Sequence, residues 1–276
     1  MTSFDKHPVE FYGKLVSHET KGEFLPLFES QHCPFLDRRC VKQRKSDSRQ
    51  TIGSCTVGYR ELPLIICPHR FLQNNQIFLD CVRLLEPNLR YVIVPEVKTM
   101  GGNVDYFLVG LRNEEIVDYL GIEIQALDTT GSGGIWEARE DLSMGELSPP
   151  YSYGINWKMS AKTILVQMHH KAAEFEALGK KLVLVIQTKF LDYIAREFQT
   201  ERIEEAKHSN SVHFHSYDAV MLGDQIQLTL NKRKSTDVLG VERMLSAGER
   251  PEFLEEELLK RIQAKMSEAI ELNAPT

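Results

Sequence analysis

The chain has 276 residues, 42% of them hydrophobic, and a formal net charge of −6 at pH 7. This is enough apolar material for one large buried core, and no run of 18 apolar residues suggests a membrane-spanning helix. The opening stretch MTSFDKHPVEFYGK lacks the apolar segment of a signal peptide. The composition therefore predicts a soluble, cytoplasmic protein with no membrane partner.

Charge is unevenly spread along the chain. Between residues 33 and 70, eight Arg and Lys stand against three acids, whereas from residue 249 onward seven Glu stand against four Lys and Arg. A basic segment on an acidic protein can bind a phosphate backbone, because the local field decides where DNA docks. A solvated basic loop accounts for the same charges equally well, so charge alone leaves both interpretations open.

The first elements follow from hydrophobic periodicity. Residues 33–70 carry cysteines and are predicted to be loop-rich. Residues 71–87 predict a helix, because their apolar positions fall near one face and Pro87 ends the pattern. Three strands are predicted next, the first of them buried, at residues 91–97, 103–111 and 115–127.

The second half of the pattern begins after the glycine-rich residues 128–134. A helix is predicted at 158–180, a strand covered on both faces at 181–187, and a helix at 191–198. The order helix, three strands, helix, strand predicts a mixed α/β core. Residues 249–272 predict an amphipathic helix, with apolar positions at Leu254, Leu258, Ile262, Met266 and Ile270. Packing on the core is favoured for this helix, and packing on a second subunit is the alternative.

Two acids interrupt the apolar strands. Side chains alternate along a strand, so Glu123 and Gln125 share one face, and a hairpin centred on residue 114 brings Asp105 level with Glu123. Glu96 ends the preceding strand and can join them. Buried carboxylates repel one another unless a cation neutralises them, and Mg²⁺ prefers carboxylate, water and phosphate oxygens. The pattern predicts metal-assisted hydrolysis; the alternative is that these acids face solvent on a one-sided sheet.

Four cysteines precede these strands. Cys33, Cys40, Cys55 and Cys67 are separated by gaps of six, fourteen and eleven residues. Four thiolates in a short, apolar-poor segment favour a tetrahedral structural site for Zn²⁺ or iron, which would supply folding energy. Unrelated buried thiols are the alternative. Cys81 is predicted to be a small core residue.

The carboxylate spacing resembles a known signature. Asp105, seventeen residues, and then Glu123-Ile124-Gln125 resembles the PD-(D/E)XK nuclease motif, with Gln in place of the usual Lys. The predicted element order is similar to the core of that superfamily. A second register, Asp80 followed by Glu96-Val97-Lys98, contains the full motif but places Asp80 in a predicted helix.

The four cysteines and the carboxylate pattern together resemble the NotI-type restriction endonucleases over roughly residues 30–190. This resemblance implies a restriction-endonuclease-like mixed sheet flanked by helices, with a four-cysteine metal module. It divides the chain into residues 1–70, with the module at 33–70, and residues 71–276. In the family the module holds iron, but this sequence leaves iron and zinc open.

The resemblance also assigns roles to residues. Asp105, Glu123 and Glu96 would bind catalytic Mg²⁺, and Gln125 would orient the attacking water. A glutamine carries no charge, so the group that stabilises the transition state besides the metal stays open, with Lys98 and Lys162 as candidates.

The implied activity is that of a type II restriction endonuclease, which cuts double-stranded DNA at a GC-rich palindrome and leaves 5′-phosphate ends. A homodimer would match the palindrome, and a cognate DNA methyltransferase would be its functional partner. Alternatives are a PD-(D/E)XK nuclease of repair or defence without palindrome specificity, and a non-catalytic cysteine-metal DNA-binding protein. A phosphate contact or a surface charge is favoured over base reading for each individual basic residue. Candidate DNA contacts are Arg38, Arg39, Lys42, Arg44, Lys45, Arg139 and Lys158.

Two histidine pairs stand outside this scheme. His169 and His170 are adjacent on a predicted helix and point about 100° apart, which disfavours joint chelation. His213 and His215 share one face of a strand and suggest either a metal pair or a polar edge.

Overall fold

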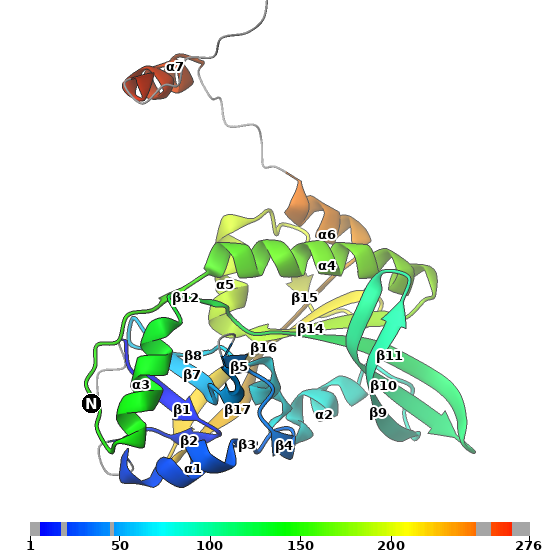
Figure 1. The fold of residues 1–276 in the computed structure, drawn as a ribbon. Coiled ribbons are helices and arrows are strands. Elements are labelled where there is room, and N and C mark those ends of the chain that lie inside the picture. The colour runs from blue at the N-terminus through cyan, green and yellow to red at the C-terminus, as the bar shows by residue number, and fades with distance from the viewer. Residues whose placement is uncertain (1–5, 18–20, 45–46, 247–254, 267–276) are drawn as a thin grey trace, which may run out of the picture. The chain divides into compact units, whose positions relative to one another are not determined.

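A computed structural model describes residues 6–17, 21–44, 47–246 and 255–266 (Figure 1). The chain forms one compact unit up to Leu245 and a second from Ser246 onward. In the second unit, helix α7 (Glu255–Ala264) lies within the helix predicted for residues 249–272; the predicted apolar positions Leu254 and Ile270 lie outside the described residues. No helix in the described ranges is long and apolar enough to cross a membrane.

The first unit is built on a mixed seven-stranded sheet, which confirms the predicted α/β core. Strands β11, β14 and β16 run parallel to one another, and the remaining neighbours pair antiparallel. In order across the sheet the strands are β15 (Glu204–Glu205), β17 (Gln225–Thr236), β16 (Val212–Leu222), β14 (Lys181–Gln187), β11 (Glu115–Gln125), β10 (Gly102–Arg112) and β9 (Arg90–Thr99).

The hairpin β10–β11 has the predicted register. Tyr106 pairs with Ile122 and Gly110 with Asp118, so the pairing is centred on residue 114. The turn is made by Asn113 and Glu114, whose φ angles are 52° and 64°. Two consecutive residues with positive φ give a tight turn that matches the twist of the flanking strands. This local geometry places the two acidic strand segments side by side.

Strand β9 is an edge strand of the described sheet, and its predicted burial is wrong. Ile93 and Val94 are 39% and 38% exposed, because β9 pairs only with β10. Pro95 fits this position, since a proline has no N–H to give to a further strand.

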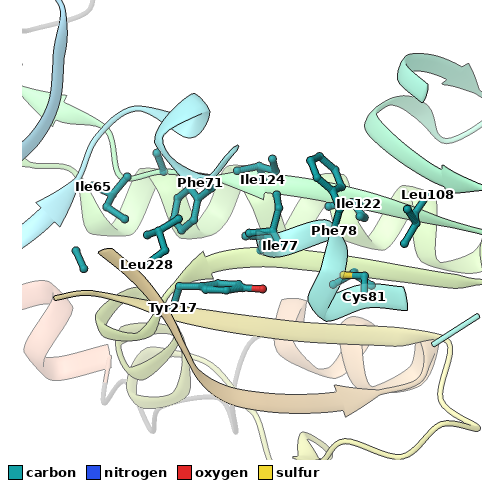
Figure 2. Close-up of a cluster of buried hydrophobic side chains, with 14 of the residues drawn as sticks. Ile65, Phe71, Ile77, Phe78, Cys81, Leu108, Ile122, Ile124, Tyr217 and Leu228 are labelled. Atoms are coloured by element: carbon teal, nitrogen blue, oxygen red, sulfur yellow. The ribbon is translucent and has the colours of Figure 1, made fainter. Parts of the chain in front are cut away.

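Helices cover both faces of the sheet (Figure 1). On one face lies α2 (Gln76–Val82), whose Phe78 and Cys81 pack with Ile122 and Ile124 (Figure 2). The opposite face is covered by α4 (Trp157–Ala177), α5 (Thr188–Glu197) and α6 (Val238–Leu245).

Strand β14 shows why both faces are apolar. Val183 and Val185 point to the α2 face, and Leu182, Leu184 and Ile186 point to the α4 face. The prediction of a strand covered on both sides is confirmed.

The helix predicted for residues 71–87 is shorter than expected. A 3₁₀ segment, η2 (Pro68–Asn75), precedes α2, and it ends on Asn74 and Asn75, whose φ angles are 54° and 55°. Asparagine tolerates this left-handed conformation better than most residues, so the pair turns the chain before α2 begins. The helices predicted at 158–180 and 191–198 correspond to α4 and α5.

The cysteine-bearing segment contains more strand than predicted. It supplies β7 (Ser54–Tyr59) and β8 (Leu62–Ile65) to a four-stranded sheet in the order β2-β1-β7-β8. The remaining short elements of the unit are β1 (Pro8–Phe11), β2 (Lys14–Leu15), η1 (Lys21–Glu23), α1 (Leu25–Ser30), β3 (His32–Cys33), β4 (Arg38–Arg39), β5 (Gln43–Arg44), β6 (Asp47–Thr51), β12 (Thr129–Thr130), α3 (Gly133–Ser143) and β13 (Gly154–Ile155).

This N-terminal sheet is tied to the ends of the central strands. Gln187, which ends β14, accepts a hydrogen bond from the Ile65 N–H (2.9 Å) and donates one to the Pro63 carbonyl (2.7 Å). The Leu127 N–H, just after β11, donates to the Ile65 carbonyl (3.1 Å). The cysteine-bearing segment therefore adjoins the C-terminal ends of strands β11 and β14. The domain boundary at residue 70 stays a prediction.

Candidate active site

Asp105 and Glu123 approach each other on neighbouring strands. Asp105 Oδ2 accepts a hydrogen bond from the N–H of Ile124, the residue after Glu123, at 2.8 Å. On its other side Asp105 lies level with Glu96 of β9, since the pairs Val104–Val97 and Tyr106–Pro95 flank it. The backbone thus brings all three predicted acids into one row across three strands.

Glu123 is buried under helix α4. Its side chain belongs to a residue only 3% exposed, and Oε1 lies 2.6 Å from Nζ of Lys171, which is 4% exposed. Sequence reasoning missed this lysine. The available signal was its position three residues after Met168 and four before Phe175, which places a charge within the apolar stripe of the helix.

The electrostatics of the pair show unbalanced negative charge. Burial raises the pKa of Glu123 to about 7; repulsion from Asp105 adds to the rise, and Lys171 opposes it. Burial also raises the pKa of Asp105, with Glu96 adding to the rise while the Ile124 N–H and Lys171 oppose it. A cation placed between these carboxylates would relieve both penalties.

Glu96 and Gln125 complete the predicted set in different ways. Glu96 is exposed and adopts a φ of 53°, which turns the backbone at this point of the edge strand. Gln125 is half-buried and its amide nitrogen donates to the carbonyl of the next residue, Ala126, at 2.5 Å. Both residues therefore lie near Asp105 and Glu123, and the contacts of the described residues do not fix their side chains to either acid.

The donor chemistry of this site suits Mg²⁺. Within the described ranges, no group of three or more His, Cys, Asp and Glu side chains is arranged as a metal-binding cluster. Mg²⁺ usually takes only one or two protein carboxylates and completes its shell with water and phosphate oxygens. Asp105 and Glu123 meet that requirement, whereas a site composed of protein ligands alone is not formed.

The four predicted metal-binding cysteines are all buried and reduced. They are Cys33, Cys40, Cys55 and Cys67. Burial is the main cause that raises the pKa of the Cys67 thiol, and Cys40 and Cys33 add to the rise. Burial also raises the pKa of the Cys55 thiol well above its usual value, and Glu10 and Cys67 add to the rise. These thiols are close enough to influence one another, but the described residues contain no group of three cysteines arranged to hold a metal, so their role as metal ligands stays a prediction. Cys81 lies in the core, as expected.

The basic segment adjoins the carboxylates. Arg38 and Arg39 are exposed on β4. Burial raises the pKa of Tyr106, with Asp105 and Glu96 adding to the rise, and Arg38 partly offsets it. Lys42 donates to the Ile66 carbonyl. Positive charge from Arg38 therefore acts on Tyr106 together with the two acids.

The other predicted DNA contacts are placed differently. Lys158 is exposed at the start of α4. Arg139 is 8% exposed and its guanidinium lies 4.5 Å from the ring centre of Phe28, a placement that favours packing over base reading. The side chain of Arg44 and the whole of Lys45 lie outside the described residues.

The histidine pairs do not join the site. His213 and His215 are fully buried on β16, an inner strand between β14 and β17, so the polar-edge interpretation is wrong. Their ring centres are 6.5 Å apart. His169 lies on the outer part of α4, 3.8 Å from Glu242, and His170 is exposed.

Comparison with known proteins gives a family match for this chain. A family model described as restriction endonuclease NotI matches residues 28–218, whereas no curated protein sequence matches the chain. The matched range begins before the four cysteines, includes the three strands with Glu96, Asp105 and Glu123, and ends within β16. It covers well over half of the 276 residues. The chain therefore belongs to the NotI restriction endonuclease family.

Proposed function

We propose that the protein is a type II restriction endonuclease that hydrolyses phosphodiester bonds of double-stranded DNA with Mg²⁺. Family membership supports a site-specific nuclease with DNA as its substrate. The observation that carries the catalytic assignment is the neighbouring pair Asp105 and Glu123: burial raises the pKa of both carboxyls, repulsion from Asp105 adds to the rise at Glu123, and repulsion from Glu96 adds to the rise at Asp105. Acids whose ionised form is disfavoured by burial indicate a site in which a bound cation offsets the negative charge.

The proposed roles follow from position. Asp105 and Glu123 would hold Mg²⁺, with Glu96 completing the site directly or through water. Mg²⁺, when bound, would supply Lewis-acid stabilisation of the phosphate and a more acidic water. The Ile124 N–H orients Asp105, and the Gln125 amide would orient the attacking water. Attack on phosphorus would leave a 5′-phosphate and a 3′-hydroxyl.

The cysteine-bearing segment would position DNA on these acids. Iron or zinc held by Cys33, Cys40, Cys55 and Cys67 would organise its short hairpins. Arg38 and Lys42 would contact backbone phosphates, because phosphate contacts fix the register of a protein on DNA. A homodimer would read a GC-rich palindrome, each subunit cutting one strand, and a cognate methyltransferase would protect the host site.

The test is a digest of GC-rich genomic DNA with the purified protein and Mg²⁺, with the fragment ends sequenced. Discrete 5′-phosphate ends that share one palindrome are expected. Cutting should disappear in EDTA and in Glu123→Ala, and it should persist in Glu115→Ala, an exposed acid at the other end of β11.

Two other results would each favour a different function. A smear of random ends would indicate a nuclease without palindrome specificity. DNA that is bound but left intact in Mg²⁺, with the cysteine metal in place, would indicate a DNA-binding protein whose acids are structural.

A further inference from the structure

The motif of this chain lacks its usual positive charge, because Gln125 stands where a lysine is common. We infer that Lys171 supplies that charge. This lysine lies on helix α4, which covers the sheet, and it acts through its contact with Glu123. The inference rests on the proposed function and concerns the same site. Lys171 would be a positioning residue: it would fix and polarise the Glu123 carboxylate and add a fixed positive field beside the scissile phosphate.

The first argument is burial. Within the described ranges Lys171 is the lysine that is buried, whereas Lys98 and Lys162, the candidates from sequence, are exposed. Lys162 lies on the solvent side of the same helix. A buried ammonium needs a close partner, and Glu123 at 2.6 Å provides one. Helix α4 thus delivers one cation directly to the acid pair.

The second argument is the apolar stripe that Lys171 interrupts. Leu165, Met168, Ala172 and Phe175 of α4 all pack in the core on this face. Burying an ion pair costs more desolvation than continuing the stripe with an apolar residue, and apolar replacements of such pairs are often neutral or stabilising. Fold stability alone therefore gives little reason for a lysine at this position.

The third argument is the close fit around Lys171. The turn between β9 and β10 contacts α4 here: a Cβ on Gly101 would lie 2.9 Å from the Lys171 Cα, and one on Gly102 would lie 3.6 Å from its Cε. The Gly101 N–H also donates to Glu174 Oε2 at 2.8 Å. The lysine is therefore held by the turn that joins the strands carrying Glu96 and Asp105.

The charges define what Lys171 can do. Lys171 opposes the rise in pKa at both Asp105 and Glu123, so its field reaches both acids. A single ammonium leaves net negative charge once the acids are ionised, so a divalent cation is still favoured. Lys171 also competes with that cation for Glu123.

The experiment compares Lys171→Met with Lys162→Met, a matched control on the exposed side of the same helix. Three quantities are measured: folding by circular dichroism, Mg²⁺ affinity without DNA by calorimetry, and single-turnover cleavage at saturating Mg²⁺ and DNA. For Lys171→Met we expect native folding, a Mg²⁺ Kd about tenfold lower because the competing cation is gone, and cleavage about 10²-fold to 10³-fold slower. Lys162→Met should match the unaltered protein in all three.

Rescue separates a charge role from a packing role. Adding Gln125→Lys to Lys171→Met restores a cation from the strand and is expected to recover cleavage at least tenfold. Failure of this rescue in a folded, Mg²⁺-binding double variant would overturn the inference, as would wild-type cleavage by Lys171→Met. If Lys171→Met does not fold, Lys171→Arg takes its place: a rate within about tenfold of wild type supports the charge role, and a complete loss in a folded protein contradicts it.

Failure of the proposed function is recognised separately. If the unaltered protein leaves DNA intact in Mg²⁺, the nuclease proposal is wrong whatever Lys171 does. The calorimetric comparison still decides the pairing: an unchanged Mg²⁺ affinity in Lys171→Met would show that Lys171 and the cation do not share Glu123, which overturns the inference.

Discussion

The central sheet buries polar groups on both faces, and the two clusters differ in charge balance. On the α4 face, Asp105 and Glu123 lie together with Lys171, the one buried cation beside them among the described residues, and burial raises the pKa of each acid. Ionisation of these acids therefore destabilises the fold. We therefore propose that a further cation completes the cluster.

On the α2 face, the buried groups are neutral or paired. Burial lowers the pKa of His213 to about 4 and that of His215 to about 3, so both rings are uncharged at neutral pH. His215 Nδ1 lies 3.6 Å from Cys81 Sγ, and His213 Nε2 lies 3.0 Å from the Asn210 carbonyl oxygen.

An acid on the α2 face, Asp80, is compensated by its partners. Asp80 accepts a hydrogen bond from the Tyr217 hydroxyl at 3.0 Å and pairs with Arg233 at 3.3 Å. A buried polar cluster whose charges are already balanced contributes to structure, whereas one that leaves a carboxylate pair under-neutralised is poised for a ligand. We therefore propose that the α4 face carries the functional site.

The largest expected effect comes from removing one acid of the α4-face pair. Asp105→Asn keeps an oxygen that can accept the Ile124 N–H, so the fold should persist, but it removes a proposed metal ligand. Cleavage should fall by about 10³-fold or more in a single-turnover assay. Cleavage within tenfold of wild type would refute the difference between the two faces.

The opposite result is expected on the α2 face. His215→Ala removes a fully buried ring, and the free energy of unfolding in urea should fall by about 2–4 kcal/mol. The fraction that remains folded should cut DNA at the wild-type rate. A loss of cleavage in folded protein would mean that the histidine cluster contributes to catalysis.

The pH dependence of stability has a definite sign on the α2 face. Below about pH 6.5 the unfolded chain protonates His213 and His215 while the folded chain does not, because the folded pKa values are lowered to about 4 and about 3. Stability should therefore fall as pH decreases from 6.5 toward 4, by up to about 1.4 kcal/mol per pH unit for each histidine.

Urea unfolding at pH 7, 6 and 5 measures this slope, and a variant with His213→Val and His215→Val should show a shallower one. An equal slope in that variant would mean that other groups account for the acid sensitivity.

The smallest expected effect lies at the surface. Arg38→Gln should weaken DNA binding severalfold and reduce the slope of log K against log salt by about 0.9 for each phosphate that the arginine neutralises. Lys207→Gln, an exposed basic residue paired with Glu204, serves as the control. Equal salt slopes for the two variants would remove Arg38 from the DNA-binding surface.

The sequence by itself determined the local features of this site. The position of the turn at residues 113–114 and the twofold alternation along a strand were enough to place Asp105 beside Glu123. The continuous apolar run at 181–187 likewise identified β14 as a strand covered on both faces. These inferences succeed because hairpin register and strand alternation depend on neighbouring residues.

Only the tertiary structure decided which partners meet across the sheet. The edge position of β9, the burial of Arg139, the inner position of His213 and His215, and the pairing of β7 with β1 all join distant segments. Lys171 is the clearest case: forty-eight residues separate it from Glu123, and α4 brings the two together. A periodic pattern shows which face of a helix is buried, but the packing of that helix decides which charge on it meets which acid.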